Sequence, residues 1–226
     1  FYLPETKPNS VSNKVKTIFK NPLKQLFTVF KEEKIRKLSL AFFIYFIAFT
    51  GLTNILIFFL QESLNWTTKA SSGTLVVVGV IAIIVQGVLI GPLVKQFGEM
   101  RLTLIGSGFI LVACSLLITA PKENATINIY SAVSFLAVGA GLITPSLRAI
   151  ISKKLDFDRQ GSILSNLQGL QSLGGVLGIA MAGRVYDSFG PKSPFIAGSI
   201  ILIFMIYLIA EGENNNSFNN QKSKAF

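Results

Sequence analysis

The chain has 226 residues, of which 50% are hydrophobic and only 14% charged, with one cysteine and no histidine. The high apolar fraction excludes a disordered protein, the single cysteine excludes a disulfide scaffold, and the lack of histidine excludes chemistry that needs an imidazole. The 21 Lys and Arg against 11 Asp and Glu give a net charge of +10, and these charges cluster between long uncharged stretches.

The first 37 residues are strongly basic. Within residues 11–38, apolar side chains recur with the period of a helix and lysines lie between them. We expect residues 8–37 to form a basic cytoplasmic connector whose amphipathic helix lies on the anionic inner leaflet, interrupted near Pro22. A solvated linker is the alternative.

Six stretches without Asp, Glu, Lys or Arg follow, each 18 to 24 residues long. At about 1.5 Å per residue they make helices of roughly 27 to 36 Å, which match a bilayer core of about 30 Å. Their short connectors leave little polar surface for water, which disfavours a bundle of buried soluble helices. We predict a transmembrane bundle over residues 38–210, with spans at 38–60, 71–94, 102–120, 125–147, 160–183 and 193–210.

The basic residues predict how this bundle lies in the membrane. Seventeen of the 21 Lys and Arg precede the first span, follow the last, or lie in the connectors after the second and fourth spans. Both termini are therefore predicted to be cytoplasmic, because basic connectors stay inside. No helical reader motif or aromatic platform accompanies the charge, which disfavours nucleic-acid binding. The Asn-rich residues 211–226 are expected to form a disordered cytoplasmic tail.

A short pattern occurs twice, 92 residues apart. Residues 91–98 read Gly-Pro-Leu-Val-Lys-Gln-Phe-Gly, and residues 183–190 read Gly-Arg-Val-Tyr-Asp-Ser-Phe-Gly. Each copy precedes the third span of a triplet, and three spans per repeat turn the second triplet upside down in the membrane. We predict an all-α membrane protein of six transmembrane helices, built as two inverted three-helix repeats, the plan of transporter halves.

Several stretches resemble the major facilitator superfamily. Residues 91–101 resemble its loop motif Gly-x-Leu-x-Asp-Arg-x-Gly-Arg, with Lys95 at the acidic position and Glu99 at a basic one. Residues 141–148 (Gly-Leu-Ile-Thr-Pro-Ser-Leu-Arg), 158–161 (Asp-Arg-Gln-Gly) and 171–178 (Gln-Ser-Leu-Gly-Gly-Val-Leu-Gly) resemble its tetracycline and multidrug efflux branch. The opening Phe-Tyr-Leu-Pro-Glu-Thr-Lys resembles the exit of the sixth helix in that branch.

This resemblance implies the C-terminal half of a twelve-helix transporter. Residues 1–7 would end a preceding transmembrane helix, and the partner would be the N-terminal six-helix half. The implied function is secondary active transport of small amphiphilic molecules across the plasma (inner) membrane by alternating access, as drug efflux by proton antiport. Proton coupling needs an intramembrane ionisable group, and the six stretches contain none, so the coupling carboxylates are expected in the other half. No cofactor, metal or enzymatic activity is expected.

In this superfamily the first and fourth helices of each half line the central cavity. Within residues 125–147, small and polar side chains recur at spacings of four and three and form one stripe: Tyr130, Ser134, Ala137, Gly141 and Thr144. Residues 38–60 offer hydrogen bonds and aromatic surface suited to an amphiphilic ligand. Helix packing by small and polar residues is the alternative. The predicted substrate-binding residues are Tyr45, Phe49, Thr50, Asn54, Tyr130, Ser134 and Gly141.

The second and fifth helices of each half face the other half in this superfamily. In residues 160–183, two polar or small faces flank a stripe that we expect to meet lipid: Ile163, Leu167, Leu170, Leu177 and Met181. Gly-x-x-x-Gly pairs at 87–91 and 174–178 permit close approach to the other half. Charged residues at the inner rim, including Arg148 and Lys153, are candidates for an inside gate or are only a topology signal. The predicted gating and interface residues are Gly91, Gly98, Arg101, Asp158, Arg159, Gln168, Gln171, Gly175 and Gly178.

An independent six-helix channel or assembly protein is the alternative function. The sequence has no Arg-repeat helix and no filter-like segment, which disfavours a voltage-gated channel. An intramembrane hydrolase would need Ser or Asp paired with His or with a second carboxylate, and the spans lack those partners.

Overall fold

The computed structural model describes residues 27–121 and 125–224, and the side chains of these residues except 157–158 and 212–224. Residues 1–7 and most of the predicted amphipathic connector lie outside this part. Throughout the described residues the secondary structure is helical. In chain order the elements are η1 (Phe27–Lys31), α2 (Arg36–Leu64), α3 (Thr68–Ile84), η2 (Val85–Leu89), α4 (Ile90–Phe97), α5 (Glu99–Ile118), α6 (Thr126–Lys153), α7 (Phe157–Phe189) and α8 (Ser193–Lys224).

Each predicted span coincides with a long helix. The second span is continuous from α3 through η2 to α4, and η2 is a single π-helical turn within it. Five helices in the described part are long and apolar enough to cross a membrane: α2, the α3–η2–α4 helix, α5, α6 and residues 193–211 of α8. The sixth, α7, is longer, with 33 residues, but is rich in Ser, Asn, Gln and Gly.

Helix α8 continues past the last predicted span, where we expected disorder. It runs to Lys224, and at its exit from the apolar stretch Glu211 pairs with Lys37 of α2 at 2.6 Å. A helix already formed in the membrane extends by one hydrogen bond per residue without a new nucleation step, so polar residues that follow it can stay helical.

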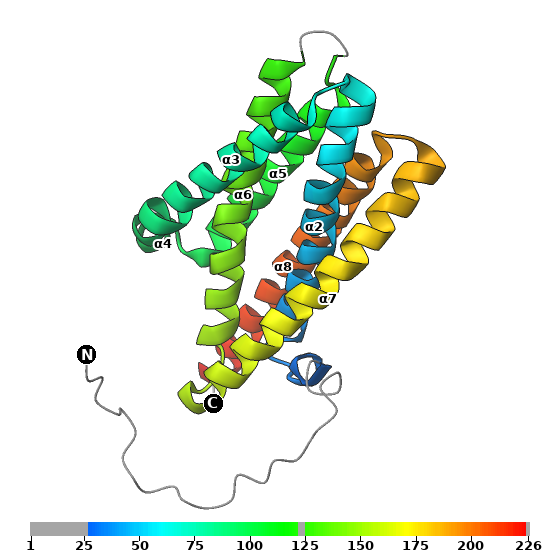
Figure 1. The fold of residues 1–226 in the computed structure, drawn as a ribbon. Coiled ribbons are helices and arrows are strands. Elements are labelled where there is room, and N and C mark those ends of the chain that lie inside the picture. The colour runs from blue at the N-terminus through cyan, green and yellow to red at the C-terminus, as the bar shows by residue number, and fades with distance from the viewer. Residues whose placement is uncertain (1–26, 122–124, 225–226) are drawn as a thin grey trace, which may run out of the picture.

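The two triplets interlock with the symmetry that the repeat predicts (Figure 1). Helix α2, first in its triplet, packs against α7 and α8, and α6, first in the other triplet, packs against α3 and α5. Contacts between α2 and α6 and between α5 and α8 complete the core. If each helix of the first triplet is exchanged with its counterpart in the second, so that α2, the second span and α5 replace α6, α7 and α8, the same set of helix pairs results. This symmetry confirms the inverted three-helix repeat.

The last glycine of each repeated pattern makes the same turn. Gly98 has φ 77° and ψ 157° between α4 and α5, and Gly190 has φ 92° and ψ 173° between α7 and α8. Each amide donates to the carbonyl four residues earlier, of Val94 and of Tyr186, at 2.9 Å. This backbone region is accessible essentially to glycine alone, so the pattern encodes two equivalent turns at opposite ends of the bundle.

Gly98→Ala and Gly190→Ala should each lower stability, because a Cβ strains the backbone at positive φ. We expect a loss of about 1–3 kcal/mol, seen as a fall of roughly 2–10 °C in the thermal unfolding midpoint of the detergent-purified protein. Gly91→Ala and Gly183→Ala are matched controls from the same pattern: both positions are helical with open space around them, so alanine should be neutral or slightly stabilising. Equal behaviour of the two pairs would contradict the turn assignment.

Candidate functional site

The predicted cavity stripe of α6 divides into an open part and a packed part. Tyr130 and Ser134 line a cavity of about 460 Å³ together with Phe109, Phe135 and neighbouring residues. The ring of Tyr130 lies 6.0 Å from that of Trp66, between centroids. The outer half of the stripe therefore remains accessible.

Gly141 belongs to the packed part of the stripe. It is buried, and a Cβ placed on it would lie 2.7 Å from Cγ1 of Val85 in the π-helical turn η2. The position thus brings α6 close to the second span and does not present a surface to a ligand. This corrects the substrate-binding prediction for Gly141 in favour of its helix-packing alternative.

The predicted residues of α2 lie on a mixed aromatic and polar face. The Tyr45 ring is fully buried and stacks on Phe49 with 5.5 Å between centroids, and its hydroxyl lies 3.4 Å from the Thr144 hydroxyl on α6. Thr50 is partly exposed and Asn54 is exposed, and the Asn54 amide donates to the Thr50 carbonyl at 2.9 Å. Tyr45 is therefore a core residue that joins α2 to α6, whereas Thr50 and Asn54 stay on the surface.

A polar cluster forms where α6 meets α7. Nη2 of Arg148 donates to Oε1 of Gln168 at 2.7 Å and also to Oε1 of Gln171, and the guanidinium lies 5.9 Å from the centroid of the Phe42 ring on α2. The two glutamines lie about 16 and 21 Å along α7 from its first residue, at 1.5 Å per residue. The structure thus brings together Gln168 and Gln171, both predicted, around Arg148.

Sequence reasoning placed Arg148 only among the charges of the inner rim. A signal for its deeper role was available, because Arg148 follows Thr144 by four residues and so continues the spacing of the cavity stripe. An arginine side chain is long enough to carry its charge back along the helix toward the membrane interior. The stripe therefore ends in a cation.

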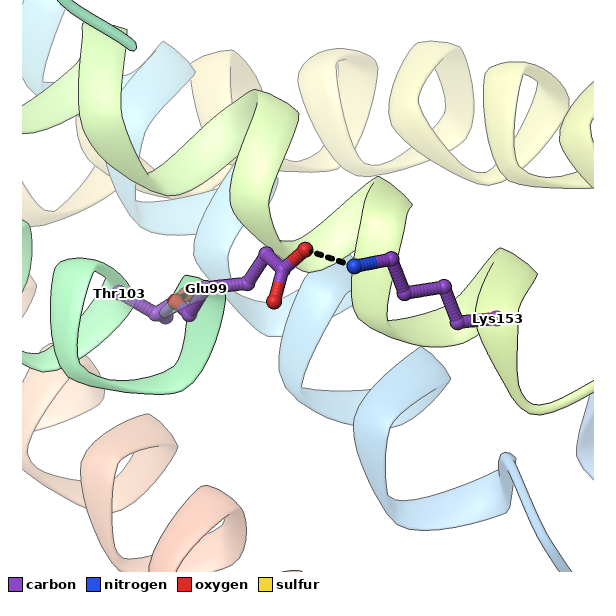
Figure 2. Close-up of polar contacts among 3 residues, drawn as sticks. All are labelled: Glu99, Thr103 and Lys153. Atoms are coloured by element: carbon purple, nitrogen blue, oxygen red, sulfur yellow. Dashed lines mark hydrogen bonds and ion pairs between the residues drawn. The ribbon is translucent and has the colours of Figure 1, made fainter. Parts of the chain in front are cut away.

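The inner rim is tied together by ion pairs within this chain. Figure 2 shows the Glu99 carboxylate at the start of α5 facing the Lys153 ammonium near the end of α6, and the two groups form an ion pair. The Thr103 hydroxyl donates to the Glu99 carbonyl one turn away at 2.9 Å. Glu99 stands where the loop motif has a basic residue, so in this chain the exchanged charge serves to link α5 to α6.

The other rim residues lie apart from this pair. Arg159 pairs with Glu32 at 2.9 Å, which fastens α7 to the segment that precedes α2. Arg101 is exposed, and none of the ion pairs in the described part of the chain includes it. The side chain of Asp158 lies outside the described residues. A single gate built from these rim charges is therefore not assembled within this half.

The glycines predicted at the interface have different surroundings. Gly91 is exposed with open space around it, and Gly98 forms the turn after α4. A Cβ on Gly175 would lie 3.6 Å from Thr50, an ordinary contact. Gly178, in contrast, is buried against the Ile47 carbonyl of α2. This corrects the prediction for Gly178: its lack of a side chain serves the α2–α7 crossing inside this bundle.

The first half of the α7 stripe that we expected to face lipid faces inward, whereas Leu177 and Met181 of the same stripe are 40% and 49% exposed. Ile163, Leu167 and Leu170 are buried in the core, 6%, 0% and 0% exposed. The polar side chains on other sides of the helix are exposed instead: Ser162, Ser165, Gln168 and Ser172. A helix of the second triplet therefore turns a polar surface away from its own bundle.

Interlocked triplets of membrane-capable helices, with polar groups on the cavity helices, define an integral membrane protein of the transporter class. The pattern of the Major Facilitator Superfamily matches residues 1–179. The chain therefore belongs to this superfamily.

Similar proteins include resistance transporters and a solved transporter structure. The chain is 28% identical over 131 residues to the class H tetracycline resistance protein of Pasteurella multocida, covering 58% of this chain and 32% of that protein. It is 22% identical over 167 residues to multidrug resistance protein 2 of Bacillus subtilis (strain 168), covering 73% and 40%. Its fold matches the human organic anion transporter MFSD10 (TETRAN) with a TM-score of 0.72 at 20% identity, covering 84% of this chain and 46% of that one. The chain thus spans less than half the length of each of these proteins.

Gly178→Ala and Gly175→Ala, three residues apart on α7, should distinguish a glycine required for helix packing from one that tolerates a side chain. Alanine at 178 meets the α2 backbone and must push the helices apart, which we expect to cost about 1–3 kcal/mol by overpacking. Alanine at 175 fits in ordinary contact with Thr50. The check is the thermal midpoint and monodispersity of the purified variants; a tolerated Gly178→Ala would show that the α2–α7 crossing is looser than described.

Proposed function

We propose that this chain forms one half of a secondary transporter that moves small amphiphilic molecules by alternating access, as the C-terminal partner of a second six-helix bundle. The observation that carries the proposal is the exposed polar row on α7, Ser162, Ser165, Gln168 and Ser172. Lipid provides no hydrogen bonds, so a polar surface within a membrane needs protein or a water-filled cavity beside it. The short coverage of the relatives fits a missing half.

The cavity wall contributed by this half would lie on α2, α6 and α7. Thr50 on α2 adjoins Gly175 of α7, the Asn54 amide donates to the Thr50 carbonyl, and Gln171 adjoins Arg148 of α6, so the polar surface continues across the three helices. Aromatic rings beside hydrogen-bonding groups suit a small molecule with apolar and polar parts. The names of the tetracycline and multidrug resistance relatives are in keeping with such substrates.

The second span is suited to move against the other half. Most of α3 is exposed, with only Ser71 and Thr74 buried, and the π-helical turn η2 interrupts the span at Val85–Leu89. Gly87 and Gly91 have open space around them. A π-turn and small residues allow a helix to adjust its register and approach a neighbour closely, as rocking of one bundle against another requires.

Proton antiport would place its carboxylates in the other half, because the six uncharged stretches contain no acidic residue. The proposed location is the plasma (inner) membrane, with both termini cytoplasmic. In this orientation the Glu99–Lys153 and Arg159–Glu32 pairs lie at the cytoplasmic rim.

Single-cysteine labelling tests the proposed orientation. In a Cys114→Ala background, which removes the one native cysteine, Lys69→Cys and Lys192→Cys should react with a membrane-impermeant maleimide in intact cells. Lys95→Cys and Lys153→Cys should react only after permeabilisation. All four lysines are exposed, so burial does not limit the reaction. Labelling of Lys69→Cys and Lys153→Cys from the same side would overturn the topology.

Asn54→Leu tests the proposed function in the complete transporter. Removing the exposed amide should change drug selectivity severalfold in efflux assays while membrane expression persists, because the amide bonds only its own helix and its loss leaves packing intact. Ser115→Leu on α5 is the matched control: its exposed hydroxyl also bonds a carbonyl four residues earlier, at 3.0 Å, but Ser115 does not line the proposed cavity. Unchanged drug accumulation for Asn54→Leu would remove α2 from the cavity wall.

A further inference from the structure

Arg148 differs in its surroundings from the three cations that form ion pairs in the described part of the chain. Lys37, Lys153 and Arg159 each pair with a carboxylate, whereas none of the ion pairs among the described residues includes Arg148. Its hydrogen-bond partners are the two amide oxygens of Gln168 and Gln171, which carry no net charge. The guanidinium therefore has oriented neighbours and no counterion within this part of the chain.

The guanidinium also keeps unused donors. An arginine has five N–H groups, and here one nitrogen, Nη2, makes both hydrogen bonds. The Nε atom is buried and has no partner. Arg148 is partly buried, so its charge loses part of its hydration without gaining a counterion, and a negatively charged oxygen bound to an accessible donor would offset that loss.

The surroundings fix the guanidinium in one orientation. The two glutamine oxygens hold Nη2 from the α7 side, and the Phe42 ring lies 5.9 Å from the guanidinium carbon on the α2 side, within range of a cation–π contact. Because Nη2 already donates to both glutamines and Nε is buried, the Nη1 N–H groups are the donors that remain for an acidic oxygen. The geometry is that of an anion receptor.

Its position joins this receptor to the proposed cavity. Arg148 lies one turn beyond Thr144 on the α6 stripe, and the Thr144 hydroxyl is 3.4 Å from that of Tyr45. The aromatic pair Tyr45 and Phe49 lies on the same side of α2 as Phe42. Tyr45 and Phe42 are buried, so the partly exposed Phe49 is the ring of this group that the apolar part of a molecule bound at Arg148 would meet.

We propose that Arg148 binds the carboxylate, or an equivalent acidic oxygen, of the transported molecule, so that the substrates are amphiphilic organic anions. The inference rests on the proposed transport function and adds the charge of the substrate to it. A carboxylate supplied by another segment of the complete transporter has the same chemistry. The two sources differ in their effect on selectivity, because only a substrate carboxylate makes Arg148 distinguish anions from cations.

Two dyes with one skeleton separate these sources. In proteoliposomes containing the complete transporter, uptake of fluorescein, an anion, is compared with uptake of rhodamine 6G, a cation, for the unmodified protein and for Arg148→Gln. We expect Arg148→Gln to raise KM for fluorescein by about 10- to 100-fold, the range for losing a charged hydrogen bond, with less than about twofold change for rhodamine 6G. Arg148→Lys keeps the charge without the planar guanidinium and should lie between the two.

The controls distinguish binding from folding. Arg36→Gln removes an exposed arginine at the start of α2 that none of the ion pairs among the described residues includes, and it should leave both dyes unaffected. The thermal midpoint of Arg148→Gln should match that of the unmodified protein, and its fluorescein affinity, measured by fluorescence anisotropy on the purified protein, should fall by the same factor as KM rises. Equal losses for both dyes, or no loss for either, would overturn the inference and assign Arg148 to a protein carboxylate or to packing.

The outcomes also separate this inference from the proposed function. If the unmodified protein transports rhodamine 6G but not fluorescein, the transport proposal stands and the anion proposal fails. If it transports neither dye, the transport proposal fails for these amphiphiles, and the anisotropy measurement alone decides whether Arg148 binds an anion.

Discussion

A polar group inside a membrane must find its partner in protein, and this requirement shapes the whole chain. The backbone meets it by being helical throughout the spans. The side-chain hydroxyls of the spans meet it by donating to carbonyls of their own helix, as Thr53 does to Phe49 at 2.9 Å and Ser134 to Tyr130 at 2.8 Å. A polar group of a span that has no hydrogen-bond partner in the chain is therefore informative, because lipid supplies no water to bind it.

Without a hydrophobic effect between helices in lipid, close packing has to hold the triplets together. The two tightest crossings use glycines in facing pairs: Gly51 with Gly178 between α2 and α7, and Gly106 with Gly139 between α5 and α6. In each pair a Cβ on one glycine would lie within 3 Å of the carbonyl oxygen of the other or of a residue in the facing helix. These contacts account for the glycines of α7 that sequence motifs alone assign to an outer interface.

Polar groups left over after internal packing mark where function lies. The exposed serines and Gln168 of α7 and the uncompensated guanidinium of Arg148 lie on the surfaces of the helices that line the proposed cavity. The exposed surface of α3 is apolar, with Val76 66% and Ile83 73% exposed. It needs no hydrogen-bond partners and is compatible with lipid or with a second bundle. Membership of the major facilitator superfamily gives the exposed polar side chains of α7 and the Arg148 guanidinium a common interpretation as one wall of the proposed transport path.

The sequence by itself determined the six helices, their repeat and their family, because the length of an uncharged stretch and a glycine pattern are local properties. The turn glycines Gly98 and Gly190 follow from the same pattern. The sequence also predicted Thr50, Asn54, Gln168 and Gln171 as site residues, because their polarity within a span is visible without a structure.

Only the tertiary structure decided which side of each helix meets which neighbour. A rotation of α7 about its axis exchanges its leucine stripe with its serine face, and the mixed composition of both sides leaves that rotation open in the sequence. Packing against α2 turned Leu167 inward and used Gly178 for the crossing. The same packing set Gln168 and Gln171 beside Arg148, a contact between residues 20 and 23 positions apart that depends on how α6 and α7 lean together.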